Sequence, residues 1–277
     1  MSVQYRLNRL FAADGKCCEV AMDHGVHNEP SFLPGIENLG KVVDVIADGG
    51  ADAILLSMGL APLLQSKIRP KNPALVLRAD PTNFYGMPAQ TEMFCNLQHL
   101  AVERALALDA VGLVVNLLWA ADRPNLHRQC VNNISRLKPE CDRYGMPLIV
   151  ESLLMMPDPK TGGYKHDSDV ARSVGLVRQA VELGADAVKT DPLDNLDGYC
   201  KVIEAAAGRP LLLRGGSRVS DTELLTRTQR LMQQGAAGVV YGRNIYQHAH
   251  PQKMLQACNA IIHEGASVEK AQAILNS

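Results

Sequence analysis

The sequence has few aromatic residues and no excess of charge of either sign. Aromatic side chains make up 4% of the 277 residues, and 28 basic against 29 acidic residues leave a formal net charge of −1. A chain without a basic surplus has no overall field that attracts nucleic acid or an anionic membrane. We therefore expect neither partner, and an anionic substrate would have to meet local basic groups or helix N-termini.

Signals for secretion, membrane insertion and structural zinc are also missing. Residues 1–16 contain no apolar signal-peptide segment, and no apolar run approaches the roughly 20 residues of a membrane span. The seven cysteines include no C-x-x-C pair, which excludes a zinc ribbon and a thioredoxin motif. We expect a protein of the reducing cytoplasm whose free thiols pack in its core.

What the sequence does contain is a repeated alternation of short apolar runs with longer stretches of helical periodicity. Nearly continuous apolar character over the length of a strand is typical of parallel strands that are buried on both faces. The predicted strands cover residues 17–23, 51–57, 74–79, 109–116, 147–152, 185–190, 210–215 and 237–242. The predicted helices cover residues 36–48, 92–107, 123–144, 168–183, 194–207, 220–234 and 251–263, with a short helix after Gly242.

This alternation predicts a single (β/α)8 barrel over residues 1–277. Ser220 and Glu223 form a capping box at the start of one helix, and Gly184 stands just past the end of another, where a left-handed residue is expected. An open, doubly wound sheet is the alternative, but no G-x-G-x-x-G follows the first strand. The longest loop signal, residues 155–167, follows the fifth strand.

The C-terminal ends of the predicted strands carry polar side chains. Active sites of such barrels lie at this end. Every apolar run has to end somewhere in a polar residue, and this alone could explain any one of these polar side chains. It accounts less well for an acid on the first strand, an acid on the fifth and a lysine within the sixth. The residues at the strand ends are Asp23, Ser57, Arg78, Asn116, Glu151, Lys189, Arg214 and Arg243.

Lys189 is the sharpest chemical signal, because it lies within the apolar segment ADAVKTDP. A lysine is rarely buried unless it is paired or functional. Burial disfavours the ammonium form, and a neutral lysine amine attacks a carbonyl carbon to give a Schiff base. The alternative is a lysine whose ammonium reaches out of the barrel or pairs with Asp191.

Glycine-containing segments follow the last two strands. Gly215, Gly216 and Ser217 precede the capped helix, and Gly242 and Arg243 begin the short one. Backbone N–H groups near glycine and a helix N-terminus can bind an anion, and barrels commonly bind phosphate after strands 7 and 8. Arg243 would add a charged contact to the phosphate oxygens.

The histidines do not predict a metal site. His24 and His27 follow Asp23, and His248 and His250 form a second pair, but neither pair has a third ligand at a recognisable spacing. H-E-x-x-H, a Walker loop and a nucleophile elbow are all absent. We therefore expect no metal and no cofactor.

Taken together, MDHG at 22–25, GADAVKTD at 184–191, the Gly-Gly loop and GVVYGRNIYQ at 238–247 resemble the DeoC/FbaB class I aldolase superfamily. The likeness runs from about Ala21 to Pro251 and is greatest to the archaeal-type (DhnA-like) fructose-bisphosphate aldolases. That branch also holds the aminodideoxyheptulosonate synthases and the autoinducer-phosphate thiolase.

The resemblance implies a metal-free Schiff-base mechanism on a phosphorylated sugar or ketone, in a homo-oligomer. It places Lys189 at the Schiff-base lysine and Asp23 at an aspartate that assists the proton steps. The phosphate site falls on Gly215, Gly216, Ser217, Gly242 and Arg243. We add Asn116, at the end of the fourth strand, to the substrate-binding residues.

One position departs from the pattern. The archaeal-type aldolases carry an acid/base tyrosine on strand 5, where this chain has Leu153. The same strand offers Glu151, which resembles the catalytic glutamate of the tagatose-bisphosphate aldolases, and Tyr164 in the following loop is a second candidate. Three functions stay open: an aldolase, a Schiff-base acyltransferase of thiolase type, and a sugar-phosphate-binding barrel without catalysis.

Overall fold

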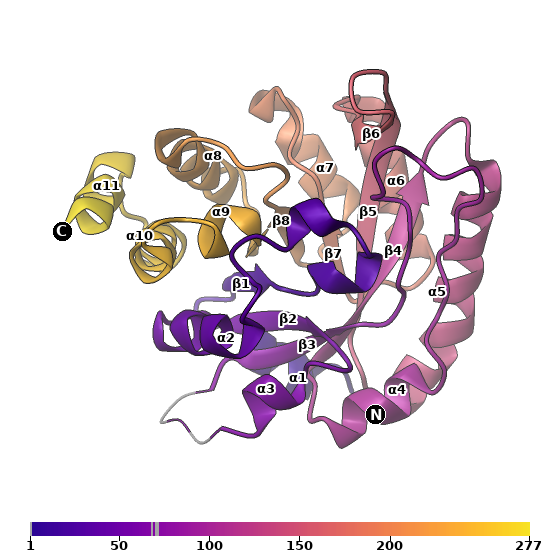
Figure 1. The fold of residues 1–277 in the computed structure, drawn as a ribbon, viewed down its shortest axis with the longest axis horizontal. Helices are drawn as coiled ribbons and strands as arrows, with labels where there is room; N and C mark the ends of the chain where they lie inside the picture. The colour runs from indigo at the N-terminus through magenta and orange to yellow at the C-terminus, as the bar shows by residue number, and fades with distance from the viewer. Residues whose placement is uncertain (1, 68, 70–71) are drawn as a thin grey trace.

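The computed structural model describes residues 2–67, 69 and 72–277. Within this part of the chain, eight parallel strands close into a barrel, in the order β1-β2-β3-β4-β5-β7-β8-β9, with β9 paired to β1 (Figure 1). The closure confirms the predicted (β/α)8 fold, because an open, doubly wound sheet would leave two unpaired edge strands. Each predicted strand has its counterpart in the barrel.

The strands differ from the predicted ranges by a few residues at their ends. Their bounds are β1 Cys17–Ala21, β2 Ala53–Ser57, β3 Ala74–Arg78, β4 Gly112–Trp119, β5 Leu148–Asp158, β6 Gly163–His166, β7 Ala187–Thr190, β8 Leu211–Arg214 and β9 Gly238–Tyr241.

Helices pack around the outside of the barrel (Figure 1). Their bounds are α1 Gln4–Leu10, α2 Leu39–Asp48, α3 Pro62–Gln65, α4 Ala101–Ala107, α5 Pro124–Tyr144, α6 Val170–Glu182, α7 Tyr199–Ala205, α8 Asp221–Gln233, α9 Arg243–Tyr246, α10 Pro251–Glu264 and α11 Val268–Asn276. The predicted cap of α8 is present, since Ser220 Oγ accepts a hydrogen bond from the amide of Glu223 at 3.3 Å. Gly184 has the predicted left-handed conformation, with φ of 98°.

Alternate residues of each strand face opposite sides of the barrel wall. On β1, Cys17 and Ala21 belong to the apolar cluster inside the barrel, whereas Cys18 and Val20 belong to the larger cluster beneath the helices. Both sides of the wall are therefore apolar, which is why the strands read as continuous apolar runs. Most polar side chains that point inward lie at the ends of the strands, and Glu19 in the middle of β1 is a buried exception.

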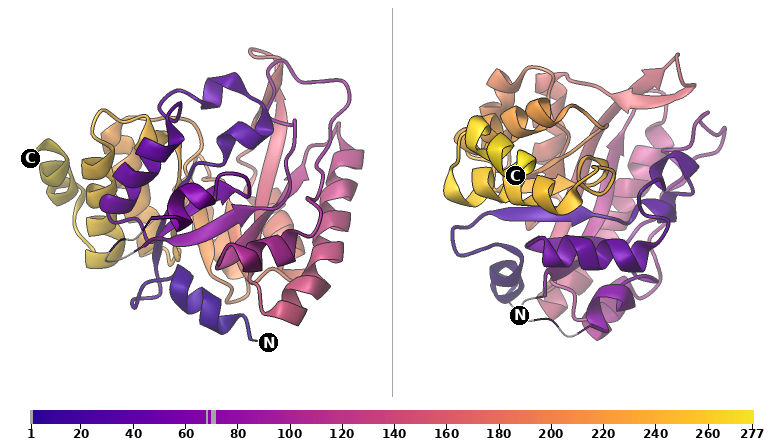
Figure 2. Two further views of the ribbon diagram at one scale, coloured as in Figure 1. Left: turned by 60° about the horizontal axis from the view of Figure 1, so that its bottom comes forward. Right: turned by 60° about the vertical axis from the view of Figure 1, so that its left-hand side comes forward.

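The segment 155–167 is not a simple loop. β5 continues to Asp158 and turns back as β6, which pairs with it in antiparallel register between Met155 and His166. Figure 2 shows this hairpin extending beyond the end of the barrel. The pairing supplies backbone hydrogen bonds to a stretch whose Pro, Gly and Lys content is typical of loops.

The predicted helix 92–107 begins only at Ala101. The preceding residues form a long loop in which Asn83 holds the chain by side-chain hydrogen bonds to the amide of Phe94 and the carbonyl of Glu92.

Helices α1, α3 and α11 have no counterpart in the predicted pattern. Figure 2 places α11 beside α10 near the C-terminus, so it adds a peripheral helix and leaves the barrel unchanged.

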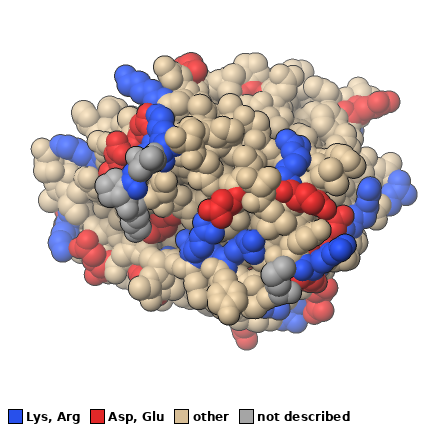
Figure 3. Space-filling model, turned by 90° about the horizontal axis from the view of Figure 1, so that it is seen from below, with Lys and Arg blue, Asp and Glu red and all other residues tan. Residues whose placement is uncertain are grey.

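The distribution of charged side chains on the surface agrees with the nearly zero net charge of the sequence. On the face that Figure 3 shows, basic and acidic side chains are interspersed, and no large area has one sign. No helix within residues 2–67, 69 and 72–277 is long and apolar enough to cross a membrane.

Candidate active site

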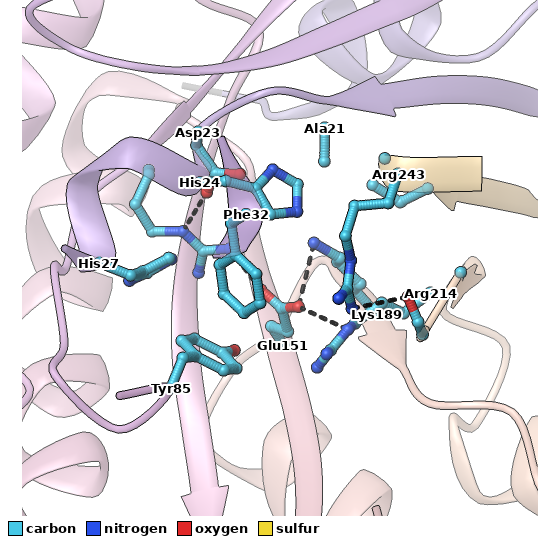
Figure 4. A pocket seen from close by; sticks show the side chains of 15 residues that line it. Ala21, Asp23, His24, His27, Phe32, Tyr85, Glu151, Lys189, Arg214 and Arg243 are labelled. Carbon is cyan, nitrogen blue, oxygen red and sulfur yellow. Dashed lines mark hydrogen bonds and ion pairs between the residues drawn. The ribbon is translucent and has the colours of Figure 1, made fainter. Parts of the chain in front are cut away.

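A pocket lies at the C-terminal ends of the strands, between the loops that follow them (Figure 4). Its wall combines charged side chains from the strand ends with glycines and aromatic rings from the loops. The lining residues are Ala21, Asp23, His24, His27, Phe32, Arg78, Tyr85, Glu151, Lys189, Arg214, Gly215, Gly216, Val240, Gly242 and Arg243. The pocket therefore brings together most of the residues that the sequence singles out.

Lys189 is a buried lysine with an acidic partner. It lies on β7, directly opposite Glu151 in the register with β5, and its Nζ is 3.0 Å from Glu151 Oε1. Its relative exposure is 3%. The ammonium therefore does not extend out of the barrel, and its ion pair is with Glu151 rather than with Asp191.

Arg78 joins the two acids of the pocket. Its Nη2 donates to Glu151 Oε2, and its Nε donates to Asp23 Oδ2 at 2.8 Å. Burial by itself would raise the pKa of Glu151, but the charges of Lys189, Arg78 and Arg214 outweigh burial and hold that pKa well below its usual range. Burial also opposes ionisation of Asp23, and Arg78 nevertheless lowers its pKa to about 2. Both acids are therefore anions at neutral pH.

Asp191 belongs to a neighbouring group of charges. Its Oδ1 lies 3.4 Å from Arg214 Nε, and its Oδ2 lies 3.3 Å from His166 Nδ1. Arg214 Nε is also 4.0 Å from Glu151 Oε1, and among the described residues its Nη1 is buried without a hydrogen-bond partner. Arg214 thus keeps hydrogen-bonding capacity at the pocket wall for a ligand.

The glycine loops after β8 and β9 form another part of the pocket wall. Arg243 Nη2 donates to the carbonyl of Gly216 at 3.0 Å, and Asn244 Nδ2 donates to the carbonyls of Gly215 and Ser217. The amides of Gly216 and Ser217 have no hydrogen-bond partner among the described residues. Free amides beside an arginine suit an anion.

Gly242 shows why a glycine is needed on this wall. A Cβ at this position would lie 2.7 Å from His24 Cε1 and 3.1 Å from the carbonyl oxygen of Ala21. The backbone after β9 thus packs so closely on the ring of His24 and the end of β1 that a side chain would fit only if His24 moved. The approach narrows the pocket beside His24.

Three predicted residues lie outside the lining of this pocket. Asn116 is fully buried, and its Nδ2 donates to Asp80 Oδ1 at 2.9 Å, so it supports the strand end behind Arg78. Ser217 lies in the loop after β8 but lines the outer grooves beside the pocket. Tyr164 lies on β6 and its hydroxyl bonds to Asp122 and Arg123. The roles of Asn116 and Ser217 in substrate binding stay predictions.

The sequence predicted no function for several other residues of the pocket. Arg78 and Arg214 were visible as polar strand ends, but their partners depend on neighbouring strands. Phe32 and Tyr85 come from the loops after β1 and β3, where no periodic pattern marks them. Leu153, at the position of the family's strand-5 tyrosine, is buried in the apolar core and does not line the pocket.

The histidines of the pocket are packed as neutral rings. His24 contacts Phe32 and Tyr246 edge-on, each with ring centroids 5.5 Å apart. Burial lowers the pKa of His24 to about 3 and that of His27 to about 4. Among the described residues, no three His, Cys, Asp or Glu side chains form a group that could hold a metal ion.

Comparison with known proteins places the chain in a family. Residues 17–248 match the model of the DeoC/LacD family aldolases. An uncharacterized aldolase of Saccharolobus solfataricus is 32% identical over 98% of both chains. The 3-hydroxy-5-phosphonooxypentane-2,4-dione thiolase of Klebsiella pneumoniae is 30% identical over 97% of this chain and 84% of its own. The solved structure of a Schiff-base-forming fructose-1,6-bisphosphate aldolase is 22% identical and superposes with a TM-score of 0.77, covering 95% of this chain and all of that one.

The barrel carries a lysine and an acid at its mouth, and the chain belongs to the DeoC/LacD aldolase family. The superfamily resemblance found in the sequence is thereby confirmed. The protein is an enzyme of the aldolase class.

Proposed function

We propose that the protein is a class I aldolase that breaks or forms a carbon–carbon bond in a phosphorylated ketose. The three-carbon product would be dihydroxyacetone phosphate or a similar ketone. The observation that carries this proposal is the pair of Lys189 and Glu151, 3.0 Å apart in a pocket whose wall also includes the glycine loops and Arg243. The pocket thus joins an amine nucleophile to an anion site.

In the cleavage direction, the phosphate binds the amides of Gly216 and Ser217 and the guanidinium of Arg243. Lys189 first gives one ammonium proton to the solvent and attacks the ketone carbon as a neutral amine. The carbinolamine that forms then loses water to become an iminium. The electrons of the C3–C4 bond then move toward the iminium nitrogen, the C4 hydroxyl loses its proton, and an aldehyde leaves. The remaining enamine is protonated and hydrolysed, which releases the ketone and restores Lys189.

Glu151 and Asp23 serve this sequence as fixed negative charges. Glu151 faces the nitrogen of Lys189 throughout, so its carboxylate stabilises the iminium cation. Asp23 holds the guanidinium of Arg78, which in turn orients Glu151. The iminium supplies the electron sink, so the proposed chemistry requires no metal.

Reduction with borohydride tests the proposal directly. The wild-type protein is incubated with candidate ketose phosphates and borohydride, and mass spectrometry locates the added mass. We expect a covalent adduct on Lys189 for the true substrate and none in Lys189→Ala. Lys201→Ala, which removes an exposed lysine of α7, is the matched control and should react normally. Absence of an adduct in wild type with every ketose phosphate would favour the barrel that binds sugar phosphates without catalysis.

A second candidate is an acyltransferase of thiolase type that acts on a phosphorylated diketone. It is favoured by the 30% identity to the Klebsiella pneumoniae thiolase over 97% of this chain. Both candidates would form the same adduct on Lys189. Product analysis with and without coenzyme A separates them, because only the transferase requires the thiol as acceptor.

We also propose that the enzyme works in the cytoplasm as a homo-oligomer. The free thiols support the reducing compartment: six of the seven cysteines are buried, and only Cys200 is exposed. The oligomer rests on the family resemblance. Light scattering on the purified protein tests the oligomer, and a mass near 30.1 kDa would contradict it.

A further inference from the structure

The pocket contains a phenol that the proposed reaction has not yet used. Of the described tyrosines, only Tyr85 lines the pocket, and it comes from the long loop after β3. In Figure 4 its hydroxyl is turned toward Glu151. Among the described residues this hydroxyl has no hydrogen-bond partner.

The ring of Tyr85 is held firmly although its hydroxyl is free. It contacts His27 at 4.8 Å between centroids, Phe32 at 5.7 Å and Phe84 at 5.9 Å, all edge-on. The guanidinium carbon of Arg214 lies 5.8 Å from the ring centroid on the pocket side. These contacts fix the direction of the C–O bond without occupying the oxygen, as a group that acts on a substrate requires.

The acids of the pocket are poorly suited to moving protons. Glu151 is bound by both Lys189 and Arg78, and Asp23 is bound by Arg78, so each carboxylate stays ionised and has no proton to give. Tyr164 is turned away, because its hydroxyl is engaged by Asp122 and Arg123. The reaction nevertheless needs a donor at the carbinolamine and an acceptor at the C4 hydroxyl.

We propose that Tyr85 is the catalytic acid and base of this site, a role that rests on the Schiff-base function proposed above. Its phenolic proton passes to the carbinolamine oxygen, the C–O bond breaks, and water leaves as the iminium forms. The phenolate then takes the proton of the C4 hydroxyl while the C3–C4 bond breaks and its electrons reach the iminium nitrogen. The phenol is restored and the enamine is formed, so protons and electrons balance.

The surrounding charges agree with this order of events. Burial raises the pKa of Tyr85 well above its usual range, and Glu151 and Asp191 add to the rise, whereas Arg214 and Arg78 oppose it. In the resting pocket the phenol therefore holds its proton. Once the iminium cation lies beside it, the cation and Arg214 both stabilise the phenolate.

Tyr85→Phe tests the role, with Tyr164→Phe as the matched control. Phenylalanine keeps the ring contacts and removes only the hydroxyl. We expect Tyr85→Phe to lower kcat by about 10²–10⁴-fold and to slow the single-turnover formation of the borohydride adduct, with KM for the phosphorylated substrate nearly unchanged. Tyr164→Phe should match wild type in all three measurements.

Two results would overturn the proposal. One is a kcat of Tyr85→Phe within about twofold of wild type, and the other is a raised KM with unchanged kcat, which would make Tyr85 a binding residue. If Tyr85→Phe does not fold, 3-fluorotyrosine at position 85 keeps the shape and lowers the phenol pKa. The basic limb of the pH profile should then move to lower pH, and an unmoved limb contradicts the role. A wild-type protein that forms no adduct would instead overturn the proposed function itself.

Discussion

Glu151 Oε1 lies 3.0 Å from Lys189 Nζ because the two residues are directly opposite each other on the adjacent parallel strands β5 and β7. Neighbouring strands are about 4.8 Å apart, so two inward-facing side chains in register meet without any loop having to position them. The other carboxylate oxygen of Glu151 accepts from Arg78. The nitrogen that would become the iminium is therefore held by rigid elements on the barrel wall.

Replacing Glu151 by glutamine should separate adduct formation from turnover. Glu151→Gln keeps the side-chain shape but removes the negative charge beside Lys189 and Arg78. We predict that the variant still forms an adduct with borohydride but turns over at least about a hundredfold more slowly, in line with the loss of one group that stabilises charge in the transition state. Glu182→Gln, which alters an exposed acid of α6, is the control. Near-normal turnover of Glu151→Gln would remove Glu151 from the mechanism.

The anion site can be tested at Gly216 without a steric clash. This residue has φ of 66°, and a Cβ added to it would meet no atom within 4 Å. Asp and Asn both tolerate the left-handed conformation better than most residues. Gly216→Asp should raise KM for a phosphorylated substrate, whereas Gly216→Asn, of equal size but uncharged, should raise it far less. Equal KM values for the two variants would place the phosphate elsewhere.

Arg243→Ala examines the same site through its guanidinium. The loss of a charged hydrogen bond is worth about 1.5–3 kcal/mol, so KM for a phosphorylated substrate should rise roughly tenfold or more. An unphosphorylated analogue should be affected little. Steady-state kinetics with both substrates provides the measurement, and an equal rise for the two would show that Arg243 does not bind phosphate.

Glu19 should make the stability of the fold depend on pH. It is 1% exposed, and neither carboxylate oxygen has a hydrogen-bond partner among the described residues. Burial raises its pKa from 4.5 to about 7, although Lys189 opposes the rise. Between these pH values the folded protein keeps a proton that the unfolded chain has lost. The free energy of unfolding should therefore decrease as pH rises from about 4.5 to 7.

Denaturant unfolding of wild type and Glu19→Gln at pH 5 and pH 8 measures this effect. A raised pKa of this size is worth roughly 2–3 kcal/mol between the two pH values. Glu19→Gln should lack that contribution. Its free energy of unfolding relative to that of wild type should therefore be higher at pH 8 than at pH 5. The same difference at both pH values would show that Glu19 ionises normally.

Activity should survive chelators, because the proposed electron sink is the covalent iminium on Lys189. The rate of triose-phosphate release is compared before and after dialysis against EDTA. Equal rates are expected. Loss of activity that a divalent ion restores would contradict the mechanism and direct attention to His24 and His27 as ligands.

The sequence by itself determined the barrel and the end at which its chemistry lies. Apolar runs of strand length, separated by capped helical segments, are local patterns, and buried parallel strands leave little alternative to a wall that is apolar on both sides. The polar residues that end these runs are equally local. Lys189, Glu151, Asp23 and Arg243 could therefore be named before their neighbours were known.

The tertiary structure alone decided which of these residues meet. Lys189 pairs with Glu151 and not with the nearby Asp191, because closure of the barrel sets the register of β5 against β7 while Asp191 is drawn to Arg214 and His166. Tyr85 enters the pocket from an irregular loop that no periodic pattern describes. Contacts between strands and from loops depend on register and chain reversal, and these are set by packing of the whole barrel rather than by any short stretch of sequence.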